Sequence, residues 1–573
     1  MTYEPEEWDL SDISPEDLDR VLIEVERRTA DIEKRRPLSG DISQDDFMRL
    51  VKDLEAISII SSKLGAYASL RVEADSSDQE ALALRSKLNS IFTKKANRLL
   101  FISLWFKDLP EEKAKELIKT SGKYHYHFEE IRRTKPYTLK ENEEQIINIK
   151  DITGASALNN IYDILTSQFE YDLEGKKVSQ QDLIVLVRDP SPEKRKAAYL
   201  SLLTKYKEHK DVLGEIYKNI VNDWREESIG LRKYKSPINV RNVANDIPDE
   251  AVDALLKVAE KNQHIFHKFF EIKRKKLGLK KLRRFDIYAP VEEEEKKVDY
   301  DRAVNMVLEA YEEFSPVFRE HASAILDKKH VHSRLQKNKH TGAFCYCGTT
   351  KVDPFILLNF AGTLRDVSTL AHELGHGVHD ILAKDQTEFT FHPSLPMAET
   401  ASIFGEMLLS EKLKKEDPEA AKALAFSKVD DLYASIIRQA GFVTFEKKAH
   451  KMMEEGKTFD ELNRVYLNDI KAQLGPDIEV DSIFQHEWNY IPHIYHTPFY
   501  CYAYAFGNLL VLALWEMYKK DNKFSGRIIE MLSKGGSESP AQMTEAIGID
   551  IKDEGFWQQG FDVIEKMIGE LEP

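Results

Sequence analysis

Cysteine is scarce in this chain of 573 residues, which contains only Cys345, Cys347 and Cys501. Three thiols are too few for a disulfide framework in a chain of this length, and they fit a reducing compartment. The pair Cys345 and Cys347 is too isolated for a zinc ribbon. We therefore expect all three cysteines to be ordinary packed thiols.

Long apolar runs are missing as well. The longest, around residues 509–515, lies between Asn508 and Glu516 and is much shorter than the roughly 20 residues of a membrane-spanning helix. The opening MTYEPEEWDLSDISPEDLDR is acidic and lacks the basic start and apolar stretch of a secretory signal. We expect a soluble, cytoplasmic protein with no membrane partner.

Positive charge is in deficit. The chain has 82 Lys and Arg against 98 Asp and Glu, a formal net charge of −16. Binding to phosphate backbones needs a concentrated basic surface, so this balance argues against a nucleic-acid partner. No period of 20–50 residues repeats, so the sequence does not support a solenoid.

Helical patterns dominate what is present. Residues 45–64 and 78–106 carry apolar side chains at three- and four-residue spacing, which predicts amphipathic helices of a bundle. A chain this long needs several helical layers or two domains. Ser191-Pro192-Glu193 is a strong helix start. We place a boundary there, between an N-terminal helical region, residues 1–190, and a second region, residues 191–573.

Three short segments interrupt the helices. FEYDLEGKKVS predicts a small hairpin or an extended turn, and the glutamates at 292–295 predict an exposed loop. In TGAFCYCGTTKVDPFILLNF, glycines, aromatic residues and β-branched residues predict short strands at 342–349 and 354–360. A small sheet is thus expected next to the helix that follows.

That helix contains TLAHELGHGVHDIL, residues 369–382, with an H-E-x-x-H motif. His372 and His376 lie one turn apart on one face, so both imidazoles can reach one metal ion at about 2.0–2.1 Å. Glu373 is suited to act on a water at the metal without being a ligand. The motif arises by chance in roughly one chain in twenty of this composition, so an accidental match is the alternative.

Two glycines, Gly375 and Gly377, lie within the same helix. Each costs about 1 kcal/mol relative to alanine in a helix interior. Locally unfavourable residues tend to occur at functional sites. We expect the missing side chains to let a strand or a substrate backbone approach the metal-binding face.

A third metal ligand must come from elsewhere. His379 lies seven residues after His372, about 10 Å along a straight helix, so it cannot share the ion and more plausibly supports a ligand or packs in the core. MAETASIFGEMLLSEKL places Glu399 and Glu406 on one face of a predicted helix. Glu399 could ligate the ion and Glu406 could orient a histidine; the alternative is two solvent-facing acids.

The late segment IPHIYHTPFYCYAYAFG concentrates phenols and imidazoles without a regular apolar stripe. Tyrosine and histidine side chains can donate hydrogen bonds to a developing oxyanion. The alternative is an aromatic core with its hydroxyls bonded to the backbone.

Several motifs together resemble the thimet-oligopeptidase family of zinc metallopeptidases, and within it the oligoendopeptidase F branch, over most of the chain. They are WDLSDI, VRDPSPEKRKAA, PFILLNF before TLAHELGHGVH, AETASIFGE, IRQAGFVTFE and WNYIPHIYHTPFYCYAYAFG. The resemblance implies a mainly α fold with two helical halves flanking a deep substrate channel, and a zinc-metallopeptidase catalytic region at residues 191–573.

The resemblance also implies site residues. It assigns one zinc ion to His372, His376 and Glu399, and the role of general base to Glu373. Family members place a histidine and tyrosines of the late aromatic segment near the scissile carbonyl. The residues that match this pattern are His493 and Tyr502, with Tyr495 and Tyr500 as neighbours. The segment departs from the thimet oligopeptidases in being shorter and lacking their glycine-rich stretch.

The sequence thus predicts a zinc endopeptidase for short, unfolded oligopeptides. The segment from Gly342 through Phe344 to Cys347 is expected to be an edge strand that pairs with an extended substrate. The runner-up is another zinc hydrolase, a carboxypeptidase or an amidase, and the third reading is a helical interaction protein with a degenerate site. The oligomeric state stays open.

Overall fold

The computed structural model describes residues 2–291 and 297–572, so the glutamates at 292–295 lie outside the described residues. The chain forms two compact units, each assembled from separate stretches of sequence. The first comprises Met1–Lys135, Glu295–Ala420 and Met517–Ile549, and the second Pro136–Glu294, Ala421–Glu516 and Asp550–Pro573. This division reflects packing, and the functional boundary at residue 190 stays a prediction.

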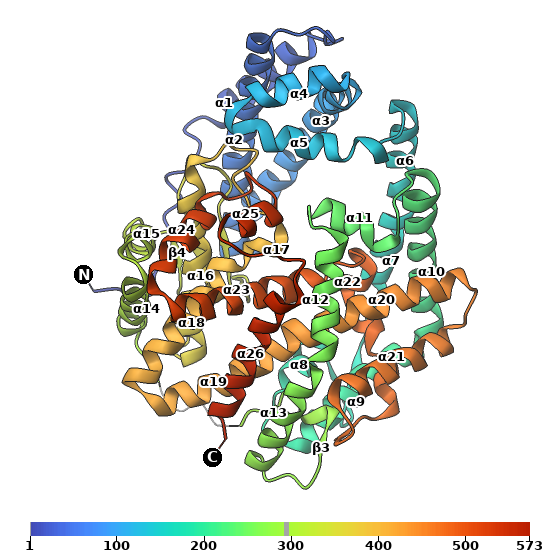
Figure 1. Ribbon diagram of the computed structural model, residues 1–573, viewed down its shortest axis with the longest axis vertical. Helices are drawn as coiled ribbons and strands as arrows, with labels where there is room; N and C mark the ends of the chain where they lie inside the picture. Colours follow the sequence, from blue (N-terminus) through green and yellow to red (C-terminus); the bar gives the residue numbers. More distant parts are fainter. Residues whose placement is uncertain (1, 292–296, 573) are drawn as a thin grey trace. The chain divides into compact units, whose positions relative to one another are not determined.

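The first unit is built from helices and one small sheet (Figure 1). Its helices are α1 (Leu18–Glu33), α2 (Gln44–Ala74), α3 (Gln79–Asp108), α4 (Glu111–Thr120), α5 (His125–Arg133), α14 (Tyr300–Phe314), α15 (Pro316–Asp327), α16 (Leu364–Leu382), α17 (Leu395–Ala398), α18 (Thr400–Glu416), α24 (Ser525–Ser533) and α25 (Pro540–Ala546), with the 3-10 turns η1 (Gly122–Tyr124), η5 (Ala383–Asp385) and η8 (Asn522–Phe524). The prediction of a mainly helical chain is confirmed.

The sheet of the first unit has the order β4 (Val331–His332), β6 (Phe355–Leu357), β5 (Phe344–Tyr346). Strand β6 is parallel to β4 and antiparallel to β5. Both β5 and β6 contact α16, so the predicted position of a small sheet beside this helix is confirmed.

The strands are shorter than residues 342–349 and 354–360. The side-chain amide of Asn359 donates to the carbonyl oxygens of His340 and Gly342, at 2.9 and 3.0 Å. To extend the pairing of β5 with β6 in this direction, backbone N–H groups would have to take the place of this amide. At the other end, Pro354 has no N–H to contribute.

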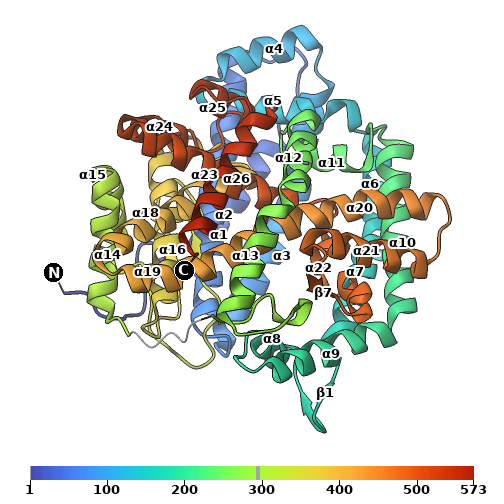
Figure 2. The same ribbon diagram turned by 60° about the horizontal axis from the view of Figure 1, so that its bottom comes forward.

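The second unit is also helical (Figure 2). Its elements are α6 (Glu141–Thr153), α7 (Ala155–Ser167), β1 (Tyr171–Leu173), β2 (Lys176–Val178), α8 (Gln180–Leu186), α9 (Pro192–Glu208), α10 (Lys210–Arg225), η3 (Glu226–Leu231), α11 (Pro237–Ala244), α12 (Asp249–Lys261), α13 (Gln263–Lys276), β3 (Leu282–Arg283), η4 (Arg284–Asp286), η6 (Tyr433–Ile437), α20 (Arg438–Glu454), α21 (Phe459–Leu474), β7 (Ile478–Glu479), η7 (Ser482–Tyr490), α22 (Pro492–His496) and α26 (Glu554–Glu570). The ranges of the two units change within η2 (Lys135–Tyr137), α19 (Pro418–Leu432) and α23 (Tyr502–Lys520).

Two local predictions in the second unit are confirmed. Strands β1 and β2 form the antiparallel hairpin expected from FEYDLEGKKVS, and Figure 2 shows it beside α9. Helix α9 begins with Pro192, and the Ser191 hydroxyl accepts a hydrogen bond from the Lys194 amide. The side chain and the proline act together, because one satisfies a free helix donor and the other presets the first turn.

A buried charge network lies in the core of the second unit. The guanidinium groups of Arg284 and Arg438 lie 2.6 and 3.1 Å from Glu487 Oε1, and the Tyr466 hydroxyl donates to Glu487 Oε2 at 3.2 Å. Removing one partner of such a buried pair typically costs about 3–5 kcal/mol, because the other charge is left unpaired. The network therefore connects η4, α20, α21 and η7 through buried polar contacts.

Helices α16 and α18 run side by side in the first unit (Figure 1) with almost no space between their backbones. A β-carbon at Gly375 would lie 2.6 Å from the carbonyl oxygen of Ala401, and one at Gly405 would lie 2.9 Å from that of Ala371. Glycines on both helices thus permit a backbone-to-backbone approach that any side chain would block.

This contact corrects the expectation for Gly375. At Gly375 the close neighbour is helix α18, not a strand or a substrate backbone. Gly377 lies against the side chains of Ile325 on α15, Pro354 before β6 and Ile356 on β6, so a strand approaches the helix there through its side chains. Both glycines serve the packing of α16 within its own unit.

Cys345, Cys347 and Cys501 are free thiols. Within residues 2–291 and 297–572, no helix combines the length and the apolar composition needed to cross a bilayer.

We predict that Gly375→Ala destabilises the protein although alanine normally favours a helix by about 1 kcal/mol. The added methyl group would overlap Ala401 O at 2.6 Å, and overpacking of this kind costs about 1–3 kcal/mol. The midpoint of thermal unfolding measures the effect.

The matched control is Gly65→Ala in α2, where a β-carbon meets nothing within 4 Å. It should raise the midpoint slightly. Equal stability of Gly375→Ala and wild type would contradict the requirement for a close helix contact.

Candidate metal centre

Helix α16 presents two histidines from one face. The helix begins after Thr363, whose hydroxyl accepts from the Asp366 amide while the Asp366 carboxylate accepts from the Thr363 amide. This reciprocal cap fixes the start of the helix. His372 and His376 follow one turn apart, and their side chains are 26% and 22% exposed.

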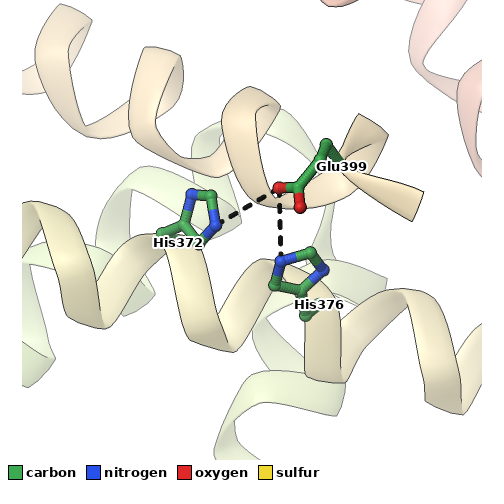
Figure 3. A group of neighbouring side chains, drawn as sticks. All are labelled: His372, His376 and Glu399. Atoms are coloured by element: carbon green, nitrogen blue, oxygen red, sulfur yellow. Dashed lines mark ion pairs between the residues drawn. The ribbon is translucent and has the colours of Figure 1, made fainter. Parts of the chain in front are cut away.

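Glu399 completes a group of three possible ligands (Figure 3). Its Oε2 lies 3.4 Å from Nε2 of His372 and 3.4 Å from Nε2 of His376. The sequence placed Glu399 within the helix of Glu406, but it directly precedes α18, at the junction with α17. The hydroxyl of Ser402 donates to Glu399 Oε2 at 3.0 Å and restrains the carboxylate.

The three residues fit a tetrahedral divalent ion. Their candidate donor atoms all lie within 4.8 Å of one another. Ligands at 2.0–2.2 Å in tetrahedral geometry are themselves roughly 3.4 Å apart, which agrees with the two distances to the Glu399 oxygen. Two imidazoles and one carboxylate suit zinc and several other first-row ions.

Glu406 lies behind one of the histidines. Its Oε1 is 2.7 Å from Nδ1 of His372, the nitrogen on the opposite side of the ring from Glu399. A carboxylate in this position fixes the tautomer and orientation of an imidazole ligand. The structure thus brings Glu406 to the place where the sequence expects it, and its role stays a prediction.

The electrostatics of the group are dominated by the carboxylates. Burial lowers the pKa of His372, but hydrogen bonds with Glu399 and Glu406 outweigh it and raise the pKa to about 10. Burial also acts to raise the pKa of Glu399, yet the two histidines hold that pKa well below its ordinary range. The site therefore attracts positive charge.

Glu373 is 6% exposed and lies between the two histidines in the sequence. Burial raises the pKa of its carboxyl group, and the nearby histidines only partly oppose that shift. A carboxylate whose proton affinity is raised in this way is a stronger base than an ordinary glutamate.

His379 stays outside this group. It is buried, and burial lowers its pKa to about 3. A neutral, enclosed imidazole at this position agrees with a packing role.

The late aromatic segment divides into exposed and enclosed side chains. His493 on α22 stacks on Tyr500 with ring centroids 5.5 Å apart, and its Nε2 lies 3.4 Å from the hydroxyl of Tyr504. Tyr500 and Tyr504 also contact edge to face at 5.3 Å. All three side chains are half-buried, so they form one accessible cluster.

Tyr495 and Tyr502 are enclosed instead. Tyr502 is 0% exposed, and its hydroxyl accepts from the side-chain amide of Asn245 at 2.9 Å. Tyr495 donates to Asn489 Oδ1 at 3.0 Å and stacks on Tyr162. Tyr504 is not among the residues predicted from the sequence. A helix start at Tyr502 would have indicated it, because residues two apart on a helix point to different faces.

Strand β5 forms an edge of its sheet within the described residues. Gly342 is exposed and precedes the strand, whereas the Phe344 ring packs against the core cluster of Trp8, Phe355 and Leu357. The chain can therefore offer the backbone of this edge, not the Phe344 side chain, to a partner.

Comparisons with known proteins show that two family models match the chain. The model of peptidase family M3 matches residues 185–563, and the model of oligopeptidase F matches residues 105–171. Oligopeptidase PepF of Bacillus subtilis is 26% identical over 588 residues, which cover 99% of this chain and 86% of that protein. Group B oligopeptidase PepB of Streptococcus agalactiae is 25% identical, with 99% and 96% covered.

Among solved structures, oligoendopeptidase-F from Enterococcus faecium has the same fold. The TM-score is 0.73 at 20% sequence identity, and the superposition covers 97% of this chain and 98% of that one.

We predict that Glu406→Gln weakens metal binding by about 10- to 100-fold, because the charged partner of His372 is lost. Competition with a chromogenic chelator measures the affinity.

The control is Glu411→Gln on the same helix, since Glu411 pairs with Lys519 and Lys414 at 2.8 and 3.1 Å and touches no candidate ligand. Equal affinities for Glu406→Gln and wild type would show that Glu406 does not support the histidine.

Proposed function

Because the chain belongs to peptidase family M3, we propose that it is a zinc-dependent endopeptidase that hydrolyses short, unfolded oligopeptides. The observation that carries the proposal is the group of two imidazoles and one carboxylate at 3.4 Å, with Glu373 beside them. The names of the relatives, oligopeptidase and oligoendopeptidase, support the substrate class.

His372, His376 and Glu399 would hold one zinc ion. When bound there, zinc lowers the pKa of a water toward about 7 and polarises the carbonyl of the scissile bond. Glu406 keeps His372 in one orientation through its contact with Nδ1.

Glu373 moves the protons of the reaction. Its carboxylate accepts a proton from the attacking water and later returns one to the leaving amine. The raised pKa of Glu373 supports the first step, because a group that binds its proton more tightly than an ordinary glutamate is the better base.

His493 and a tyrosine would donate hydrogen bonds to the oxyanion that develops on the substrate. The family pattern favours Tyr502, but the contacts within the second unit favour Tyr504. Its hydroxyl lies 3.4 Å from His493 Nε2, whereas the hydroxyl of Tyr502 is enclosed and bonded to Asn245.

The edge of β5 offers a binding place for the substrate backbone. An extended peptide can add to this edge as another strand, which accepts many sequences because the hydrogen bonds involve only main-chain groups. Gly342 at the start of the segment is exposed, and the His340 ring lies 2.9 Å from the position that a β-carbon would take there.

We predict that the wild-type protein cleaves an internally quenched, terminally blocked peptide of about ten residues. Glu373→Gln should lower kcat by about 10²- to 10⁴-fold and still bind one zinc ion, because Glu373 is not a ligand. Chelation should abolish cleavage, and added zinc should restore it. Fluorescence and metal analysis provide the measurements.

Different outcomes separate the alternatives. Loss of terminal residues from free-ended peptides, with blocked peptides intact, would indicate a carboxypeptidase or another exopeptidase. Failure of the zinc-loaded protein to cleave any peptide would reject the proposal and favour an amidase or an interaction protein.

We predict that Tyr504→Phe loses more kcat than Tyr502→Phe. Removal of one oxyanion donor costs about 10²- to 10³-fold in kcat. The Tyr502 change instead leaves the buried Asn245 amide without its acceptor and should lower stability by about 1–3 kcal/mol. Steady-state kinetics and thermal unfolding of both variants give the comparison, and the reverse order of kcat values would restore Tyr502 as the donor.

A further inference from the structure

The turn before the late tyrosines has an unusual backbone. Phe499 adopts φ 59°, the left-handed region that residues with a β-carbon rarely occupy. It is also buried. A conformation of this kind persists only where the surrounding structure enforces it.

Two side chains on different helices of the second unit form hydrogen bonds with the backbone of this turn. Glu446 on α20 accepts a hydrogen bond from the Phe499 amide at 2.8 Å. Arg241 on α11 donates from Nε to the carbonyl oxygen of Pro498 at 3.2 Å. The N–H and the C=O of the peptide bond between Pro498 and Phe499 are thus both held by side chains, which fixes the peptide plane that leads into the Phe499 α-carbon.

Helix α20 also holds the Phe499 side chain. His450, one turn after Glu446, contacts the Phe499 ring with centroids 4.7 Å apart. Glu446 is 1% exposed. Burying a carboxyl group costs free energy unless it is hydrogen-bonded, so its contact with the backbone is not that of a surface side chain.

The turn decides which tyrosines face outward. Directly after Phe499, Tyr500 is half-exposed and stacks on His493, whereas Tyr502 is enclosed against Asn245, which follows α11. The Tyr504 hydroxyl again contacts His493, at 3.4 Å from its Nε2. If the left-handed residue relaxed to an ordinary conformation, the direction of the chain at Tyr500 would change and this sorting would be lost.

We propose that Glu446 and Arg241 are positioning residues that hold the turn at Pro498 and Phe499, and thereby pre-orient His493, Tyr500 and Tyr504 for the oxyanion. The inference rests on the proposed function, since it assigns the orientation of the same catalytic cluster. Hydrogen-bond donors contribute to catalysis only when they already point at the developing charge. Glu446 and Arg241 therefore affect kcat through the orientation of these three side chains.

Glutamine is a close replacement at position 446. Burial raises the pKa of Glu446 to about 8, so the neutral acid prevails at pH 7. A glutamine has the same shape and retains one carbonyl oxygen as the acceptor for the Phe499 amide. Leucine fills a similar volume and offers no acceptor.

The test compares Glu446→Leu, Glu446→Gln and Arg241→Ala in the zinc-loaded, full-length protein. We expect Glu446→Leu and Arg241→Ala to lower kcat by at least about tenfold, as for weakened oxyanion donors, with KM and zinc content near those of wild type. Glu446→Gln should restore most of the kcat. Arg241 is half-buried, so its variant keeps the test open if Glu446→Leu does not fold.

A matched control removes a buried hydrogen bond elsewhere in the same unit. Tyr466→Phe loses the 3.2 Å bond to Glu487 and should lower the unfolding midpoint with little change in kcat. If Tyr466→Phe loses as much kcat as Glu446→Leu at equal loss of stability, the Glu446 effect is general destabilisation and the inference is overturned.

A double-mutant cycle tests whether Glu446 affects kcat through the side chain of Tyr504. If it does, Glu446→Leu should lower kcat by a smaller factor in Tyr504→Phe than in the wild type, because residues that act as a unit are not additive. Multiplication of the two single effects would overturn the inference. The proposed function fails separately, if the wild type cleaves no peptide or if His493→Ala and Tyr504→Phe keep full kcat.

Discussion

The close approach of α16 and α18 is the constraint on which the metal centre depends. Gly375 and Gly405 remove the side chains that would separate the two backbones. The start of α18 therefore lies beside the part of α16 that carries His372 and His376. A single oxygen of Glu399 lies 3.4 Å from Nε2 of both histidines. A wider helix spacing would leave the carboxylate too far away for a shared ion, because metal–ligand distances tolerate only tenths of an ångström.

The geometry of the group has an electrostatic counterpart. Three carboxyl groups, from Glu373, Glu399 and Glu406, surround two imidazoles in a largely buried place. Burial favours neutral forms, yet hydrogen bonds with Glu399 and Glu406 raise the pKa of His372, and hydrogen bonds with the two histidines lower the pKa of Glu399. Glu373 is the exception, since burial dominates its proton affinity. One helix thus carries two candidate ligands and, between them in the sequence, a buried carboxyl group with a raised pKa.

The sequence predicts those features that depend on local periodicity. The spacing of His372 and His376, the helix start at Ser191 and the hairpin at residues 171–178 follow from short-range rules. The position of Glu399 before α18 does not, because it depends on the contact between two helices. Strand lengths near Gly342 depend on the distant Asn359. The distinction between Tyr502 and Tyr504 depends on the left-handed Phe499, which no residue preference indicates and which only tertiary contacts maintain.

The candidate ligands all come from one continuous stretch, α16 to α18, in the first unit, whereas His493, Tyr500 and Tyr504 belong to the second. The order of synthesis gives this arrangement a consequence. A growing chain contains every donor of the metal group well before the aromatic cluster leaves the ribosome. Under the proposed function, the nascent chain therefore acquires its candidate metal ligands earlier than the side chains proposed to stabilise the oxyanion, and an incomplete chain lacks part of the proposed catalytic machinery.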